Sequence, residues 1–243
     1  MVELTGTILV RLIVMKYFED FLSLIYPNTC AACGNNLFRH EKTICTPCLY
    51  YLPRTNFHLD TDNPVSRVFW GRCDFFSAAS YLYFRKGGRT RHLIHNLKYK
   101  GEQQAGTRIG NLFGKDLLQS PLFCTVEVVI PVPLHIKKQK QRGYNQSEVF
   151  GAGIASGMNI AMESKVLYRT EHTETQTRKS RFSRWQNVSG KFALRNPENL
   201  EGKHVLLVDD VITTGATIEA CVNVLSEIPG TRISIGSIAY ASI

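Results

Sequence analysis

The order of apolar and polar positions predicts strands that alternate with helices from Cys73 to the C-terminus. Short apolar or aromatic runs predict strands over 75–84, 126–132, 165–168, 205–208 and 233–240. Helical spacing of apolar residues predicts helices over 90–98, 104–118, 146–157 and 217–227. Short apolar strands separated by helices are typical of a mostly parallel sheet that is covered on both faces. The expected fold class is therefore α/β.

The N-terminal part of the chain follows a different pattern. Residues 15–26 have apolar side chains at 18, 21, 22 and 25, which predicts a short amphipathic helix, and Met15 is an alternative start of the chain. Four cysteines follow, and then a proline-containing stretch of mixed polarity that we interpret as a linker. The chain divides accordingly into an N-terminal extension, a cysteine module, a linker and a large domain: 1–29, 30–50, 51–72 and 73–243.

The four cysteines have the spacing of a metal site. Cys30 and Cys33 form one Cys-x-x-Cys pair, and Cys45 and Cys48 form a second pair after eleven intervening residues. Each pair can present two thiolates from a tight turn, and two such pairs complete a tetrahedral site. Since four protein ligands leave no open position for a substrate, we predict a structural zinc ion in a small zinc ribbon. A disulfide or a redox pair suits a cytoplasmic chain less well.

Composition and charge add two points: they argue against a disordered or membrane-inserted chain, and they favour negatively charged partners. Hydrophobic residues make up 44% and charged residues 20% of the chain, as in packed globular proteins. No uncharged apolar run approaches the roughly 18 residues of a membrane helix, and no secretory cleavage pattern is present, so we predict a cytoplasmic protein without membrane insertion. The net charge of +9 favours polyanionic partners, although a solvated basic surface is the alternative.

The segment HVLLVDDVITTGAT (204–217) carries the candidate chemistry. Its apolar residues predict a central strand, and Asp209 and Asp210 follow at the carboxyl end, where open α/β sheets bind ligands. A hydroxyl-rich turn then leads into a helix: Thr213, Thr214, Gly215, Ala216 and Thr217. Backbone N–H groups and the helix dipole at such a turn can hold one phosphate. An acid pair or a threonine turn alone is commonly structural, but this order of elements indicates a binding site.

The segment VLLVDDVITTGAT resembles the ribose-phosphate loop of type I phosphoribosyltransferases. This resemblance implies that Asp209 and Asp210 form the catalytic acid pair, which holds the 2′ and 3′ hydroxyls of phosphoribosyl pyrophosphate (PRPP), and that residues 213–217 bind its 5′-phosphate. The four-cysteine module, LKYKG (97–101) and IPVPLHIKKQKQRGYNQSEVFGAGIA (130–155) are similar to the ComF/GntX group. That similarity implies a type I phosphoribosyltransferase-like domain behind a zinc ribbon, Mg²⁺ bound with PRPP, and a role in competence, DNA uptake or DNA utilisation.

The same resemblance implies where pyrophosphate binds. The turn of Pro133, Leu134 and His135 occupies the place of the family's pyrophosphate loop, and 169–191 occupies the place of the flexible loop that closes over the substrate. A departing pyrophosphate needs cations around it, and both segments have basic neighbours. The candidate cations are Arg142 after the turn and, within the loop, Arg178, Arg181 or Arg184, among which the sequence does not choose.

Two functions are compatible with these residues. One is an enzyme of the glycosyltransferase class that binds Mg²⁺-PRPP and transfers ribose 5-phosphate to an acceptor, whose identity the sequence leaves open. The other is a non-catalytic, nucleic-acid-associated accessory protein whose phosphoribosyl site is regulatory or unused. Such a protein would bind DNA, or a protein of the DNA-uptake machinery, with the help of its positive charge.

Overall fold

The large domain is built on a five-stranded parallel sheet in the order β1-β7-β6-β2-β3. The structure is a computed structural model that describes residues 27–170 and 191–241. The strands of this sheet are β1 (Ser77–Tyr83), β2 (Val128–Pro131), β3 (Ala161–Met162), β6 (His204–Ile212) and β7 (Arg232–Tyr240). A separate antiparallel pair consists of β4 (Leu167–Arg169) and β5 (Phe192–Leu194). The predicted α/β class with a mostly parallel sheet is confirmed.

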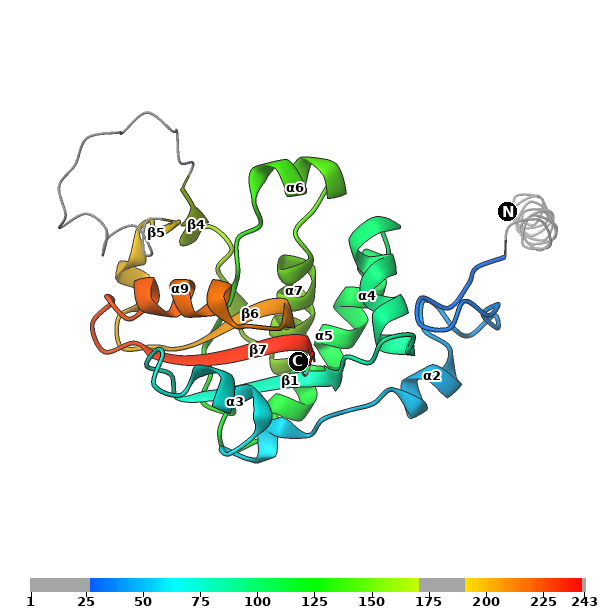
Figure 1. The fold of residues 1–243 in the computed structure, drawn as a ribbon, viewed down its shortest axis with the longest axis horizontal. Coiled ribbons are helices and arrows are strands. Elements are labelled where there is room, and N and C mark those ends of the chain that lie inside the picture. The colour runs from blue at the N-terminus through cyan, green and yellow to red at the C-terminus, as the bar shows by residue number, and fades with distance from the viewer. Residues whose placement is uncertain (1–26, 171–190, 242–243) are drawn as a thin grey trace, which may run out of the picture.

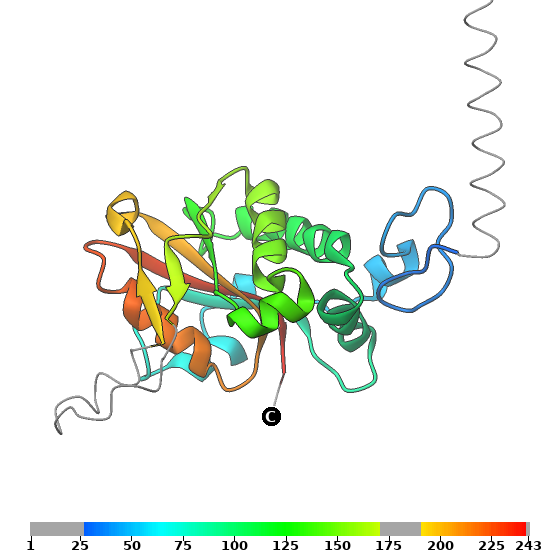
Figure 2. The ribbon, with the colours of Figure 1, turned by 90° about the horizontal axis from the view of Figure 1, so that it is seen from above.

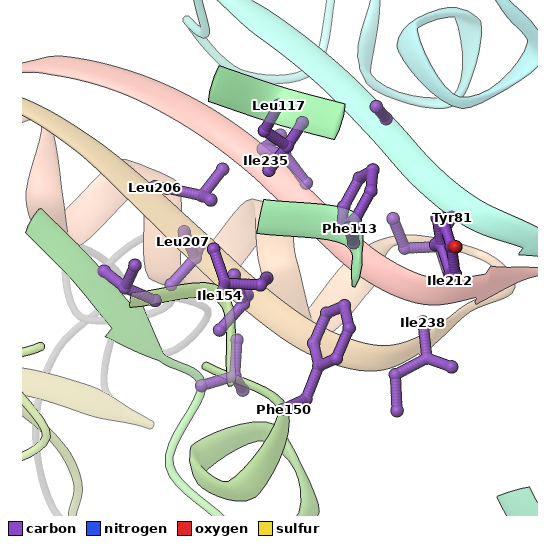
Figure 3. Packing of buried hydrophobic residues seen from close by; sticks show 14 of the residues in the cluster. Tyr81, Phe113, Leu117, Phe150, Ile154, Leu206, Leu207, Ile212, Ile235 and Ile238 are labelled. Carbon is purple, nitrogen blue, oxygen red and sulfur yellow. The ribbon is translucent and has the colours of Figure 1, made fainter. Parts of the chain in front are cut away.

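Helices cover both faces of this sheet. The covering helices are α5 (Gln103–Leu118) and α7 (Gln146–Met158) on one face, and α9 (Ala216–Leu225) and α3 (Pro64–Phe69) on the other (Figure 1, Figure 2). Between the sheet and the first pair, the rings of Phe113 and Phe150 stack with centroids 6.1 Å apart (Figure 3). The two helices approach closely because glycines line their contact: a Cβ on Gly110 would lie 2.2 Å from the carbonyl oxygen of Phe150.

The chain leaves β2 and β6 in opposite directions, which creates a crevice between them. After β2, it passes through α6 (Ile136–Arg142) and α7 to β3, whereas after β6 it passes through α9 to β7 on the other side. Pairing of β6 with β2 ends at Val208 and Pro131, but pairing of β6 with β7 continues to Ile212 and Tyr240. Ligands of open α/β sheets bind at such a switch point, outside the carboxyl ends of the strands.

The structure differs from the sequence-based expectation in the segment 51–72, which was expected to be a linker. This segment contains η1 (Phe57–Leu59) and α3 and is packed on β1. Asn63 caps α3, since its side chain accepts hydrogen bonds from the next two free N–H groups, and its Nδ2 also donates to the carbonyl of Ala78 at 2.8 Å. A proline at the first helical position starts the helix rather than breaking it, so composition alone misleads here.

Other elements agree with the sequence analysis to within a few residues. The four predicted helices correspond to α4 (Arg89–Tyr99), α5, α7 and α9. Strand β6 is longer than the predicted 205–208, so the acid pair lies inside the strand. The elements that were not predicted also include β3, β5, α6, a helical turn at 197–200 and α2 (Thr46–Tyr51). The expected helix over 15–26 and nearly all of the expected loop 169–191 lie outside the described residues. Within the described part, no helix has the length and apolar character to cross a membrane.

Candidate functional site

The acid pair lies at the crevice, and groups from two other elements contact it. Oδ1 of Asp209 accepts hydrogen bonds from the Ser147 hydroxyl at 2.9 Å and from the backbone N–H of Asp210 at 2.8 Å. Oδ2 of Asp210 lies 2.6 Å from Nζ of Lys98, near the end of α4. Burial, followed by the negative charge of Asp210, raises the pKa of Asp209 to about 7. Two carboxylates therefore lie side by side, with the ammonium group of Lys98 against one of them.

The first turn of α7 connects the acid pair to the turn after β2. The side chain of Asn145 caps α7 by accepting a hydrogen bond from the N–H of Ser147 at 3.1 Å. Its Nδ2 donates to the carbonyl of Val132 at 3.0 Å, next to Pro133. Asn145 and Ser147 are both buried. Neither residue carries a predicted role, although both lie in the segment 130–155 that resembles the ComF/GntX group.

The hydroxyl-rich turn, for which we predict a phosphate cradle, lies at the start of α9. A hollow of about 50 Å³ is lined by Asp209 and by all five predicted phosphate-binding residues: Thr213, Thr214, Gly215, Ala216 and Thr217. Among the described residues, no side chain caps α9, so its first N–H groups remain available to an anion. Gly215 has φ +74°, and a Cβ there would lie 2.7 Å from the ring of Phe69. Thus both the backbone conformation and the packing of α3 require glycine at this position.

Arg72 supports the cradle from the segment that follows α3. Its Nη1 donates to the carbonyl of Thr214 at 2.7 Å and to the carbonyl of Val68 at 3.0 Å. The same guanidinium forms an ion pair with Glu219 in the first turn of α9, where a negative charge would oppose a bound phosphate. Arg72 was missed because its segment was interpreted as a linker.

The predicted pyrophosphate turn lines a larger, strongly basic hollow of about 900 Å³. Pro133, Leu134 and His135 line this hollow together with Glu148 and six cations: Lys137, Lys140, Lys165, Arg169, Lys191 and Arg195. The predicted cation Arg142 is not part of this lining. Its Nη1 donates to Oε1 of Gln146 at 2.6 Å, and its guanidinium lies over the ring of Tyr99. The other three predicted arginines, Arg178, Arg181 and Arg184, lie outside the described residues.

The four cysteines of the module converge as a metal site would require. The sulfur atoms of Cys30, Cys33, Cys45 and Cys48 all lie within 4.8 Å of one another. Cys33 and Cys45 have their sulfurs 3.7 Å apart, close to the edge of about 3.8 Å of a tetrahedron with metal–sulfur bonds of about 2.3 Å. Burial opposes ionisation of Cys30, but N–H groups of Cys45, Cys33 and Ala32 lower its pKa to about 7. The donor set is therefore compatible with a structural zinc ion.

Comparison with known proteins shows which domain and which relatives the region around this site resembles. Residues 145–242 match the phosphoribosyl transferase domain. The chain carries a phosphoribosyl transferase domain. Over 201 residues, the chain is 28% identical to the DNA utilization protein YhgH of Shigella flexneri, covering 81% of this chain and 83% of that protein. It is also 34% identical to Competence protein F of Haemophilus influenzae over 116 residues, 47% of this chain and 51% of that one.

These relatives, together with the four-cysteine cluster, confirm the predicted resemblance to the ComF/GntX group. The matched phosphoribosyl transferase domain begins at Asn145 and so includes Ser147, the acid pair and the cradle, whereas Lys98 and Arg72 precede it. Among solved structures, glutamine PRPP amidotransferase from B. subtilis, complexed with ADP and GMP, is 24% identical with a TM-score of 0.42. That similarity covers 59% of this chain and 30% of the amidotransferase.

Proposed function

We propose that the crevice binds Mg²⁺-PRPP and that the protein transfers ribose 5-phosphate from it with release of pyrophosphate. The observation that carries this proposal is the single hollow in which Asp209 meets the cradle 213–217. Carboxylates accept hydrogen bonds from sugar hydroxyls, and the free N–H groups at the start of α9 can donate hydrogen bonds to a phosphate. Because Asp209 and the start of α9 line the same hollow, one ribose 5-phosphate could contact both groups.

The residues of the chain would act through position and charge. Asp209 and Asp210 would hold the ribose hydroxyls and stabilise positive charge that develops as the bond from the anomeric carbon to pyrophosphate breaks. The bonding electrons leave with pyrophosphate, while the acceptor forms the new bond at the same carbon. Cations beside Pro133, Leu134 and His135 would receive the leaving group.

Magnesium fits this arrangement as a companion of the substrate. Within the described residues, only the four cysteines bring three or more potential ligands together, so oxygens of PRPP would supply most of the magnesium coordination. Bound in this way, magnesium would neutralise charge on the departing pyrophosphate. Zinc would remain in the four-cysteine module, where no open position is left for a substrate.

The biological role that we propose is DNA utilisation or competence, as the names of the two relatives suggest, in the cytoplasm. A second candidate function is that of a non-catalytic accessory protein that binds DNA or a protein of the uptake machinery. The observation that favours it is the basic hollow beside α6, in which six cations face one glutamate. DNA binding of this kind would weaken steeply as salt is raised, which a titration at several ionic strengths measures.

The decisive experiment is calorimetric titration of Mg²⁺-PRPP into the zinc-loaded chain. Binding should be lost when Asp209→Ala is combined with Asp210→Ala. The matched control combines Glu198→Ala with Glu201→Ala, because these two exposed acids lie before the opposite, amino end of β6. Unchanged affinity in the Asp209 and Asp210 variant would contradict the assignment. No binding by the folded, zinc-loaded wild type would favour the accessory function.

A further inference from the structure

Helix α4 lies between the four-cysteine module and the rest of the large domain (Figure 1). On the module side, Nδ2 of Asn96 donates to the carbonyl of Ala31 at 2.9 Å, and Nδ1 of His92 lies 3.3 Å from the carbonyl of Ala32. Ala31 and Ala32 are the two residues between Cys30 and Cys33. Because His92 and Asn96 are four positions apart, they share one face of α4, and that face contacts the turn of the first cysteine pair.

Lys98 projects from another face of the same helix. It follows Asn96 by two positions, which is a rotation of roughly 200° around an α-helix. Its Nζ lies 2.6 Å from Oδ2 of Asp210, and only 21% of its side chain is exposed. The carbonyl of Leu97, between them, accepts a hydrogen bond from the Tyr144 hydroxyl. The last turn of α4 is thus fixed on one side by the cysteine module and on the other by the acid pair.

We propose that Lys98 is a positioning residue for the acid pair, and that the metal-loaded cysteine module sets its position by holding α4. The proposal rests on the function proposed above and adds a role for two parts of the chain outside the matched domain. The metal fixes the Cys30–Cys33 turn and with it the two carbonyls that α4 contacts. Removal of the metal frees these carbonyls, so α4 loses its support on the side opposite Lys98.

Such coupling is reciprocal. If the metal-loaded module favours the arrangement that binds Mg²⁺-PRPP, then bound Mg²⁺-PRPP must favour retention of the metal by the same factor. This consequence can be measured without any assay of catalysis. Couplings between two sites are typically about 5- to 150-fold, so an effect of at least about fivefold is expected.

The charge of Lys98 gives a second measurable quantity, the pH dependence of Mg²⁺-PRPP binding. Asp209 faces the carboxylate of Asp210 on β6, the ammonium of Lys98 on α4 and the thiol of Cys221 on α9. Lys98 is the cation of this group, and its charge lowers the pKa of Asp209. Without Lys98, Asp209 ionises at higher pH. A Lys98→Met variant should therefore bind Mg²⁺-PRPP at least about tenfold more weakly at pH 7 and recover at pH 9.

The test uses the full zinc-loaded chain. Equilibrium transfer of zinc to a zinc-selective chelator is measured with and without saturating Mg²⁺-PRPP. We expect PRPP to reduce transfer at least about fivefold in the wild type and in Lys100→Met, an exposed lysine two positions beyond Lys98. In Lys98→Met and in His92→Ala, the reduction should shrink to less than about twofold. Lys98→Arg should restore it.

The results of these experiments distinguish failure of the proposed coupling from failure of the proposed Mg²⁺-PRPP binding. Absence of Mg²⁺-PRPP binding in calorimetry would overturn both. Binding of Mg²⁺-PRPP without any effect on zinc transfer would overturn the coupling and leave the proposed function standing. Equal weakening of Lys98→Met at pH 7 and pH 9 would show that Lys98 has only a structural role, and would also overturn the inference.

Discussion

The hydroxyl of Ser147 donates a 2.9 Å hydrogen bond to Oδ1 of Asp209, 62 residues further along the chain. Ser147 is itself held by the Asn145 cap, whose Nδ2 reaches the carbonyl of Val132 beside the turn 133–135. One helix start therefore fixes the direction of an acid on β6 and supports the turn after β2. The ribose and pyrophosphate ends of the proposed site share this support.

Replacement of Ser147 by alanine tests that support. The Ser147→Ala variant removes a hydrogen bond to a charged, half-buried acceptor, so we expect Mg²⁺-PRPP affinity to fall about tenfold and the free energy of unfolding to fall by about 1–2 kcal/mol. Calorimetry and urea denaturation measure the two quantities. Ser156→Ala, an exposed position on the same helix, is the control and should change neither. Unaltered affinity in Ser147→Ala would contradict a role for this hydrogen bond.

Asp209 should lower the stability of the ligand-free protein. Burial and the charge of Asp210 raise its pKa to about 7, whereas an aspartate of the unfolded chain ionises near pH 4. Between these values the folded state binds more protons, so stability falls as pH rises from about 4 to 7 and the loss is complete above 7. Asp209→Asn should increase the free energy of unfolding at pH 8 by the order of 1 kcal/mol, and Mg²⁺-PRPP binding should be lost. Lower stability of Asp209→Asn at pH 8 would refute this account.

The sequence shows the parts of the site that are contiguous in the chain. The apolar run of β6, the two acids and the turn 213–217 follow one another, and their chemistry is legible without a structure. Lys98, Ser147 and Arg72 were not predicted because each acts through a contact with a residue far away in the sequence. Lysines and arginines are common at surfaces, so the residue type alone gives no signal of such a contact.

The secondary structure also divides into elements that the local sequence reveals and elements that it does not. Helices with a clear apolar face, and the long strands except for the carboxyl end of β6, were predicted almost to their ends. Helix α6 has the sequence IKKQKQR, with no buried residue and therefore no apolar periodicity to reveal it. Helix α3 was hidden by its proline and its short length, although Val65 and Phe69 are fully buried. The expected linker is packed because a few apolar positions suffice to hold six helical residues against β1.

Gly215 and Gly202 form a matched pair for testing the cradle. Both have left-handed backbone, with φ +74° and +70°, but a Cβ would contact the ring of Phe69 at Gly215 and nothing within 4 Å at Gly202. Gly202→Ala should cost only the backbone penalty of about 1–2 kcal/mol. Gly215→Ala should cost more and also abolish phosphate binding, as thermal unfolding and calorimetry with Mg²⁺-PRPP would show. Equal effects of the two substitutions would mean that α3 does not shape the cradle.

We expect the protein to lose stability in acid because of His204, which lies at the amino end of β6. Its two ring nitrogens lie 2.7 Å from Oγ1 of Thr125 and 2.8 Å from Oγ of Ser234. Burial, followed by the charge of Arg232, lowers its pKa to about 4 from the ordinary value of 6.5. The unfolded chain therefore binds a proton first, and the contribution of His204, up to about 3 kcal/mol, is lost as pH falls from 6.5 to 4.

Urea denaturation at pH 7.5, 5.5 and 4.5 measures that loss. Asp209 acts in the opposite direction over the same range, so the wild type must be compared with His204→Gln at each pH. The difference in unfolding free energy between them should be largest at pH 7.5 and should shrink toward pH 4.5. A difference that does not depend on pH would show that His204 keeps its ordinary pKa in the folded protein.

Arg72 and Glu219 provide a test of charge at the cradle. Arg72→Gln removes the cation that neutralises Glu219 and the hydrogen bond to the carbonyl of Thr214, so Mg²⁺-PRPP affinity should fall about tenfold or more. Glu219→Gln alone should leave affinity unchanged or raise it. If the uncompensated glutamate is the main cause, the double variant should recover most of the affinity of the wild type. If the double variant stays as weak as Arg72→Gln, the hydrogen bond to Thr214 rather than the charge holds the cradle in shape.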